Sequence, residues 1–235
     1  MNDNKTKYGD DNTSDPIIDN KFFFKIADLL VDPLHNMGVT PNMVTIISTI
    51  FTLLTVVFLE YDIKYIAILS FVFGYILDCV DGKIARKYNM GSNLGMTLDY
   101  SSDIISNIII LIYIIIKYPF TINNIIILVI FIFSGYMLSI VHMLNEGIAS
   151  YKKNNDYNFV KYKKKLLQDM KDSDKLYEKT LYNFFITAHT KEYDIYKKKF
   201  GDYDYDSLIN ILPYVKEFGP GTYTVIIAIL LYFIK

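Results

Sequence analysis

Four aspartates stand in two close pairs within the first half of the chain. Asp78 and Asp81 are three residues apart, and Asp99 and Asp103 are four residues apart. On a helix, spacings of three and four place both members of a pair on one face. Clustered carboxylate oxygens are ligands for hard cations such as Mg²⁺ or Mn²⁺, and they suit zinc less well. The pattern therefore predicts a divalent metal site formed by carboxylates.

Small residues and a lone arginine accompany the acids. Gly82 and Ala85 share the helix face of the first pair, and Gly95 precedes Asp99 by one turn, so a helix or ligand could approach closely at each point. Arg86 is the one arginine among 24 basic residues. A guanidinium group can hold a phosphate through two parallel hydrogen bonds, which an ammonium group cannot do. A phosphate-bearing ligand beside the metal is therefore expected.

The acids lie at the ends of long apolar stretches. These runs of Ile, Leu, Val and Phe occupy residues 43–59, 65–77, 104–116, 125–144 and 222–234, and the third becomes long enough to span when it is extended back to Met96. A bilayer span needs about 17–25 such residues in a helix. The connection between the second and third runs is short, so these helices should be antiparallel neighbours with their acidic faces opposed. The fold expected is an all-α integral membrane protein, preceded by an interfacial N-terminal helix at 21–32.

The remaining segments differ in composition. Residues 1–20 are polar and are predicted to form a disordered tail, whereas residues 21–150 are predicted to form a membrane catalytic core with the interfacial helix and four spans. Residues 151–204 are rich in Lys and Tyr and are predicted to be a polar, helical, cytoplasmic segment. Residues 205–235 are predicted to form a C-terminal membrane segment. Lysines gather at the N-terminus, around 82–95 and in 151–204, so the positive-inside rule puts the acids on the cytoplasmic side.

The motif resembles the signature of the CDP-alcohol phosphatidyltransferase family, D-x2-D-G-x2-A-R-x8-G-x3-D-x3-D. This chain supplies every fixed position, namely Asp78, Asp81, Gly82, Ala85, Arg86, Gly95, Asp99 and Asp103. The segment from Thr40 to Thr45 also resembles the entry to that family's first span. A match at eight fixed positions is far more specific than a single glycine-rich pattern.

The resemblance implies six transmembrane helices in the family, and with the apolar runs it predicts about five to six here. It also implies a cavity that holds a CDP-linked donor and two Mg²⁺ or Mn²⁺ ions. By resemblance, Asp78, Asp81 and Asp99 are metal ligands, and Asp103 is both a ligand and the catalytic base. The residues that would contact the donor are Gly82, Arg86, Ser92, Pro41, Asn42, Met43 and Val44, while Ala85 and Gly95 would serve helix packing.

The function predicted is transfer of a phosphatidyl group from a CDP-linked lipid, CDP-diacylglycerol in preference, to an alcohol acceptor, with release of CMP in phospholipid synthesis. Two alternatives remain open: a CDP-choline or CDP-ethanolamine type of enzyme that acts on diacylglycerol, and a membrane carrier of divalent cations. A net charge of −1 gives no reason to expect a nucleic-acid partner. The expected partners are the lipid bilayer and, as the resemblance implies for many members of that family, a second copy in a homodimer.

Several reactive residues receive no role from the sequence. His35, His142 and His189 are scattered without the spacing of metal ligands, and ordinary surface or interface positions are the simpler interpretation. Cys79 lies between two motif acids but faces away from them by helical phase. As the single cysteine, it cannot form an internal disulfide.

Overall fold

The computed structural model describes residues 15–235, and this part of the chain is built from helices and turns without a strand. The first elements are a π-helical turn η1 (Asp19–Phe23), α1 (Phe24–Asn36), α2 (Pro41–Glu60), α3 (Lys64–Lys87), α4 (Asn93–Lys117) and α5 (Ile122–Asn154). The all-α prediction is confirmed.

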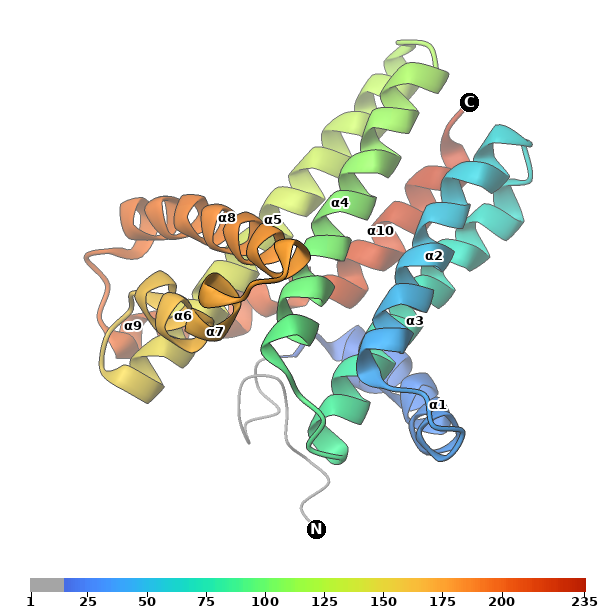
Figure 1. The fold of residues 1–235 in the computed structure, drawn as a ribbon. Coiled ribbons are helices and arrows are strands. Elements are labelled where there is room, and N and C mark those ends of the chain that lie inside the picture. Colours follow the sequence, from blue (N-terminus) through green and yellow to red (C-terminus); the bar gives the residue numbers. More distant parts are fainter. Residues whose placement is uncertain (1–14) are drawn as a thin grey trace.

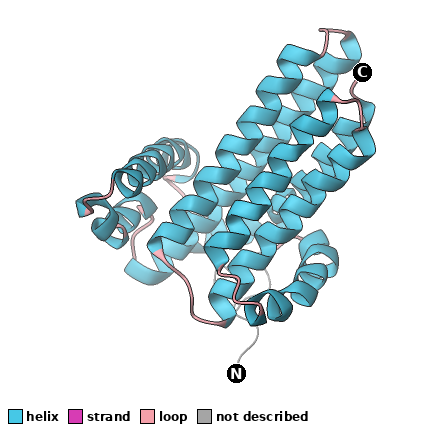
Figure 2. Cartoon of the chain, turned by 45° about the vertical axis from the view of Figure 1, so that its right-hand side comes forward, coloured by secondary structure: helices cyan, strands magenta, loops and turns pink. Residues whose placement is uncertain are grey.

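Helices α2 to α5 form two long antiparallel hairpins, α2–α3 and α4–α5, which lie side by side (Figures 1 and 2). Each of the four is long and apolar enough to cross a membrane. Their outer faces expose large apolar side chains, among them Ile126, Val129 and Ile132 on α5. Such a continuous apolar surface suits contact with lipid rather than water.

Helix α1 packs against the end of α3 that carries the first acid pair. Ala27 and Val31 are buried against Val80 and Ile84. Lys83 pairs with Asp28 at 2.6 Å along the outside of this contact, and Lys87 pairs with Asp32 at 2.8 Å. The predicted interfacial helix therefore also supports the end of α3 by packing and ion pairs.

The segment after α5 forms a helical lobe beside the bundle (Figure 1). Its helices are α6 (Phe159–Leu166), α7 (Gln168–Asp172), α8 (Leu176–Phe200) and α9 (Tyr205–Val215). The lobe buries Phe159, Tyr196 and Leu208 against the last turns of α5. Gly147 permits this contact, because a Cβ at Gly147 would lie 2.6 Å from the Tyr196 ring. Residues 159–215 are therefore largely helical and pack against the end of α5.

The last helix, α10 (Pro220–Phe233), has 14 residues and packs against α3 and α5. At about 1.5 Å per residue it is roughly 21 Å long, short of a hydrocarbon core of about 30 Å. The helix is interrupted between α9 and α10 at residues 216–219. This interruption consists of a 3₁₀ turn, η2 (Lys216–Phe218), and Gly219, and the Pro and Gly residues of the segment favour it.

Asp19 holds the start of α10. Its carboxylate accepts hydrogen bonds from the Gly221 backbone N–H at 3.1 Å and from the Tyr75 hydroxyl at 2.6 Å. The predicted tail at 1–20 lies mostly outside the described residues, but Asp19 itself is 1% exposed and belongs to η1. The ordered structure thus begins before the expected boundary at residue 21.

Replacement of Asp19 tests this contact through pH. Burial raises the pKa of Asp19 from 3.8 to about 6, despite its hydrogen bonds. The folded state therefore binds the proton more tightly than the unfolded state, and stability should fall as pH rises from about 4 to about 6. We expect Asp19→Asn to lose this part of the pH dependence of Tm in detergent. Asp202→Asn, at an exposed position, should keep it, and equal slopes in both variants would contradict the assignment.

Candidate active site

The carboxylates of Asp78, Asp99 and Asp103 converge where the end of α3 meets the start of α4. One oxygen from each lies within 4.8 Å of the others. Asp78 and Asp99 are half-buried between the helices, whereas Asp103 is exposed. The two predicted acidic faces therefore do confront each other, and one acid is open to a second molecule.

This group fits a divalent cation. Within the described part of the chain, Asp99 Oδ1 is buried and has no hydrogen-bond partner. An unpartnered carboxylate oxygen among like charges is unfavourable unless a cation compensates it. Because the group contains only oxygen ligands, it suits Mg²⁺ or Mn²⁺.

The side chain of Asp81 on α3 is held by a hydrogen bond from α2. It is 5% exposed, and its Oδ2 accepts a hydrogen bond of 2.5 Å from Thr45 Oγ1 on α2. The group of three converging carboxylates does not include it. Thr45 thus positions one motif acid, a role that sequence reasoning missed. Thr45 lies in the first apolar run, and its position opposite Asp81 on the second run follows only from the packing of α2 against α3.

Gly95 lets α2 and α4 approach. A Cβ on Gly95 would lie 2.7 Å from Asn42 Oδ1 and 3.0 Å from Ser92 Oγ. Ser92 is the N-cap of α4, since its Oγ accepts a hydrogen bond from the Gly95 N–H at 3.0 Å. Asn42 and Ser92, both predicted to contact the donor, therefore lie together beside Gly95, one turn before Asp99.

The other predicted residues differ in exposure. The Arg86 side chain folds back over Gly82, whose missing Cβ would lie 3.0 Å from Arg86 Nη1. Met43 is 49% exposed, whereas Val44 is 1% exposed within the α1–α3 core. Two further members, Pro41 (buried) and Ala85 (half-buried), complete the predicted set. Val44 therefore has almost no surface exposed for contact with a donor in this structure.

The last helix also reaches this region. Tyr223 of α10 donates from its hydroxyl to Asn107 Oδ1 at 2.8 Å, and Asn107 Nδ2 donates to the main-chain oxygen of Asp103 at 2.8 Å. Tyr223 is 7% exposed. No local pattern in the sequence connects residues 107 and 223, so sequence reasoning could not find this link.

Comparison with known proteins agrees with this geometry. The profile of the CDP-alcohol phosphatidyltransferase family matches residues 38–163, more than half of the chain. The protein therefore belongs to this family of membrane phosphotransferases, whose members transfer a phosphatidyl group from a CDP-alcohol to an alcohol. Comparisons with curated proteins and with solved structures gave no match.

Thr45→Val tests the support of Asp81. The change removes a hydrogen bond to a carboxylate, a contribution of about 1.5–3 kcal/mol, so Mn²⁺ affinity should fall by about tenfold or more. The affinity can be measured from free Mn²⁺ by electron paramagnetic resonance. Thr55→Val is a matched control on the same helix, because the Thr55 hydroxyl is buried without a partner in the described structure. Equal Mn²⁺ affinity in both variants would contradict the role of Thr45.

Proposed function

We propose that the protein transfers a phosphatidyl group from CDP-diacylglycerol to an alcohol, releases CMP and depends on two Mg²⁺ or Mn²⁺ ions. The observation that carries this proposal is the convergence of Asp78, Asp99 and Asp103 within 4.8 Å beside Arg86 in a chain of this family.

The acidic residues would hold the metal. Asp78, Asp81 and Asp99 are the proposed ligands, with Asp103 as a shared ligand. When bound, the divalent ions neutralise the diphosphate and the departing CMP. The unpartnered Asp99 Oδ1 supports this assignment. Thr45 fixes the rotamer of Asp81, which reduces the reorganisation needed when the charged donor arrives.

Arg86 and the glycines would receive the donor. The Arg86 guanidinium lies against Gly82, where no side chain intervenes, and offers planar paired donors to a phosphate. Asn42 and Ser92 lie together beside Gly95 and would form hydrogen bonds with the cytosine or the ribose of the donor. Positioning of this kind supplies much of the rate in phosphoryl transfer.

Asp103 is the proposed base. It is the exposed member of the three acids, so an acceptor hydroxyl can reach it. In the proposed step the acceptor oxygen attacks the phosphorus that bears the lipid, and the bond from that phosphorus to CMP breaks. The hydroxyl proton passes to Asp103, and CMP leaves. The link from Tyr223 through Asn107 fixes the backbone at Asp103.

The substrate can be identified by assay. Purified protein with Mg²⁺ should release CMP from CDP-diacylglycerol in the presence of inositol, glycerol 3-phosphate or serine. Release from CDP-choline or CDP-ethanolamine with diacylglycerol would favour the alternative enzyme type. Membership in a phosphotransferase family favours either enzyme over a cation carrier. No CMP release from any donor would contradict the proposal.

We also propose that the site opens to the cytoplasm. The Lys-rich helices α6 and α8 pack near the same end of the bundle as the acid-bearing ends of α3 and α4 (Figure 1). Positive residues favour the cytoplasmic side of a membrane. Labelling of a cysteine introduced at exposed Lys164 in intact cells would test this, since labelling from outside would contradict it.

Asp78→Asn and Asp103→Asn should separate binding from transfer. Asp103 is the exposed, shared member of the proposed ligand set, so in Asp103→Asn the other three acids should still hold the metal and the donor while CMP release is lost. Asp78→Asn should lose both, because a metal ligand is removed. Calorimetry in detergent measures donor affinity for each variant. Equal loss of donor binding in both would assign Asp103 to metal binding alone.

Arg86→Lys should not behave as a conservative change. Lysine keeps the charge but loses the planar pair of donors, so kcat/KM should fall at least about tenfold, or about 1.4 kcal/mol. Lys87→Arg is the converse control, since Lys87 lies on the outside and pairs with Asp32. An unchanged kcat/KM in Arg86→Lys would show that Arg86 contributes only its positive charge.

A further inference from the structure

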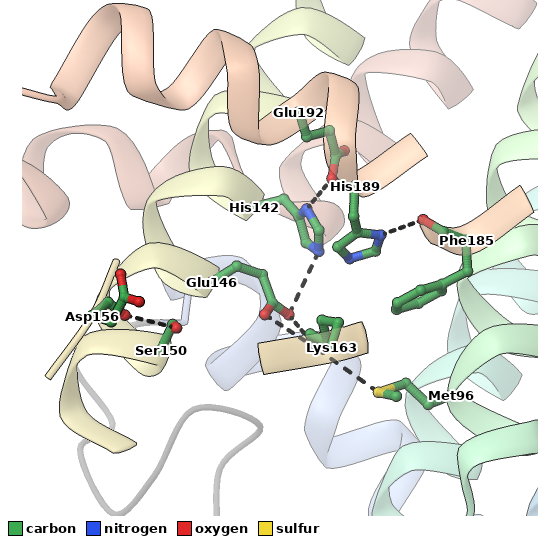
Figure 3. A network of polar contacts seen from close by, with 9 residues as sticks. All are labelled: Met96, His142, Glu146, Ser150, Asp156, Lys163, Phe185, His189 and Glu192. Carbon is green, nitrogen blue, oxygen red and sulfur yellow. Dashed lines mark hydrogen bonds and ion pairs between the residues drawn. The ribbon is translucent and has the colours of Figure 1, made fainter. Parts of the chain in front are cut away.

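A second cluster of ligand-type side chains lies between the end of α5 and α8 (Figure 3). His142 and Glu146 are one turn apart on α5, and His189 and Glu192 are one turn apart on α8. A ligand atom from each of His142, Glu146 and His189 lies within 4.8 Å of the others. None of these residues belongs to the aspartate site.

The two histidines are held through their Nδ1 atoms. His189 Nδ1 lies 3.0 Å from the Phe185 carbonyl oxygen. Because a carbonyl only accepts hydrogen bonds, Nδ1 of His189 carries the proton and Nε2 keeps its lone pair. His142 Nδ1 faces Glu192 Oε2 at 3.4 Å, while its Nε2 lies 3.8 Å from Glu146 Oε1. A ring nitrogen held by a carbonyl or carboxylate, with the opposite nitrogen left open, is typical of metal-binding histidines.

The cluster is buried and short of positive charge. His189 is 1% exposed, so its ring lies away from water. Two carboxylates, Glu146 and Glu192, face one ammonium group, that of Lys163, at 3.1 Å from Glu146 Oε2. His142 Nδ1 and Glu192 Oε2 are both buried and face each other at 3.4 Å, an ion-pair distance that falls short of hydrogen-bond geometry. Two carboxylates and one ammonium group thus lie beside the two imidazole rings, and a bound cation would compensate the second carboxylate.

We propose that His142, Glu146 and His189 bind a transition-metal ion of the zinc class, with Glu192 and the Phe185 carbonyl orienting the two rings. Two imidazoles and a carboxylate are the ligands that Zn²⁺ prefers, in contrast to the oxygen ligands of the aspartate site. The ion ties α8 of the lobe to α5 of the membrane bundle. Lys163 is an internal competitor, because it contacts both oxygens of Glu146.

The test is the retention of Zn²⁺ by the full chain in detergent. After treatment with a chelator, the protein is incubated with Zn²⁺ and excess Mg²⁺, and bound metal is counted after gel filtration. We expect about one Zn²⁺ per chain in the wild type and in Asp78→Asn. His142→Gln and His189→Gln should lose it. His35→Gln, a control at a histidine stacked on Tyr88, should retain it. Visible absorption of Co²⁺ in place of Zn²⁺ should change with the same variants.

Lys163→Met provides a second test, which does not require the replacement of a histidine. Removal of the competing ammonium should tighten Zn²⁺ binding at least about tenfold, as measured by competition with a chelating dye. The proposal is overturned if the wild type retains no Zn²⁺, if retention is indifferent to both histidine variants, or if Lys163→Met leaves affinity unchanged. The cluster would then be a network of ion pairs and hydrogen bonds among His142, Glu146, Lys163 and Glu192.

Discussion

The repulsion among Asp78, Asp99 and Asp103 is the constraint on which the arrangement of the bundle depends. Carboxylates at the end of apolar helices move apart unless the backbone holds them or a cation compensates them. Here α1 braces the end of α3 through Lys83 and Lys87. The start of α2 packs closely against the start of α4, because Gly95 has no side chain at the point of contact. The helices therefore hold the three carboxylates close together, as the proposed metal site requires.

Helix α4 connects the two clusters of ligand-type residues. Asp99 faces the acid group, while the next residue, Tyr100, faces the lobe, with its ring centroid 4.4 Å from that of His189 and 5.0 Å from that of Phe185. Adjacent residues on a helix point in directions about 100° apart, so one turn of α4 serves both sites. A shift of α8 would therefore press on the helix that carries Asp99. The packing of the lobe and the geometry of the acids are linked through this single turn.

The sequence predicted the parts of the site that depend on local spacing. The i, i+3 and i, i+4 acid pairs have a fixed relation on a helix, and a short connection made their helices neighbours. The contact of Thr45 with Asp81 and the meeting of His142 with His189 join residues 36 and 47 positions apart. Such contacts follow from the packing of whole helices, which local periodicity does not determine. The histidines therefore looked scattered until α8 was placed against α5.

Helix α10 can be short because other segments form hydrogen bonds with the chain at both of its ends. A helix end in an apolar environment needs partners for its free backbone groups. At the start of α10, Asp19 accepts from the Gly221 N–H, so the helix need not extend to find water there. At its end, Lys64 donates to the Ile234 carbonyl, and Asn124 Nδ2 donates to the Lys235 carbonyl at 2.6 Å. Because neighbouring segments satisfy both ends, 14 residues suffice to pack against α3 and α5 and to bring Tyr223 beside the acids.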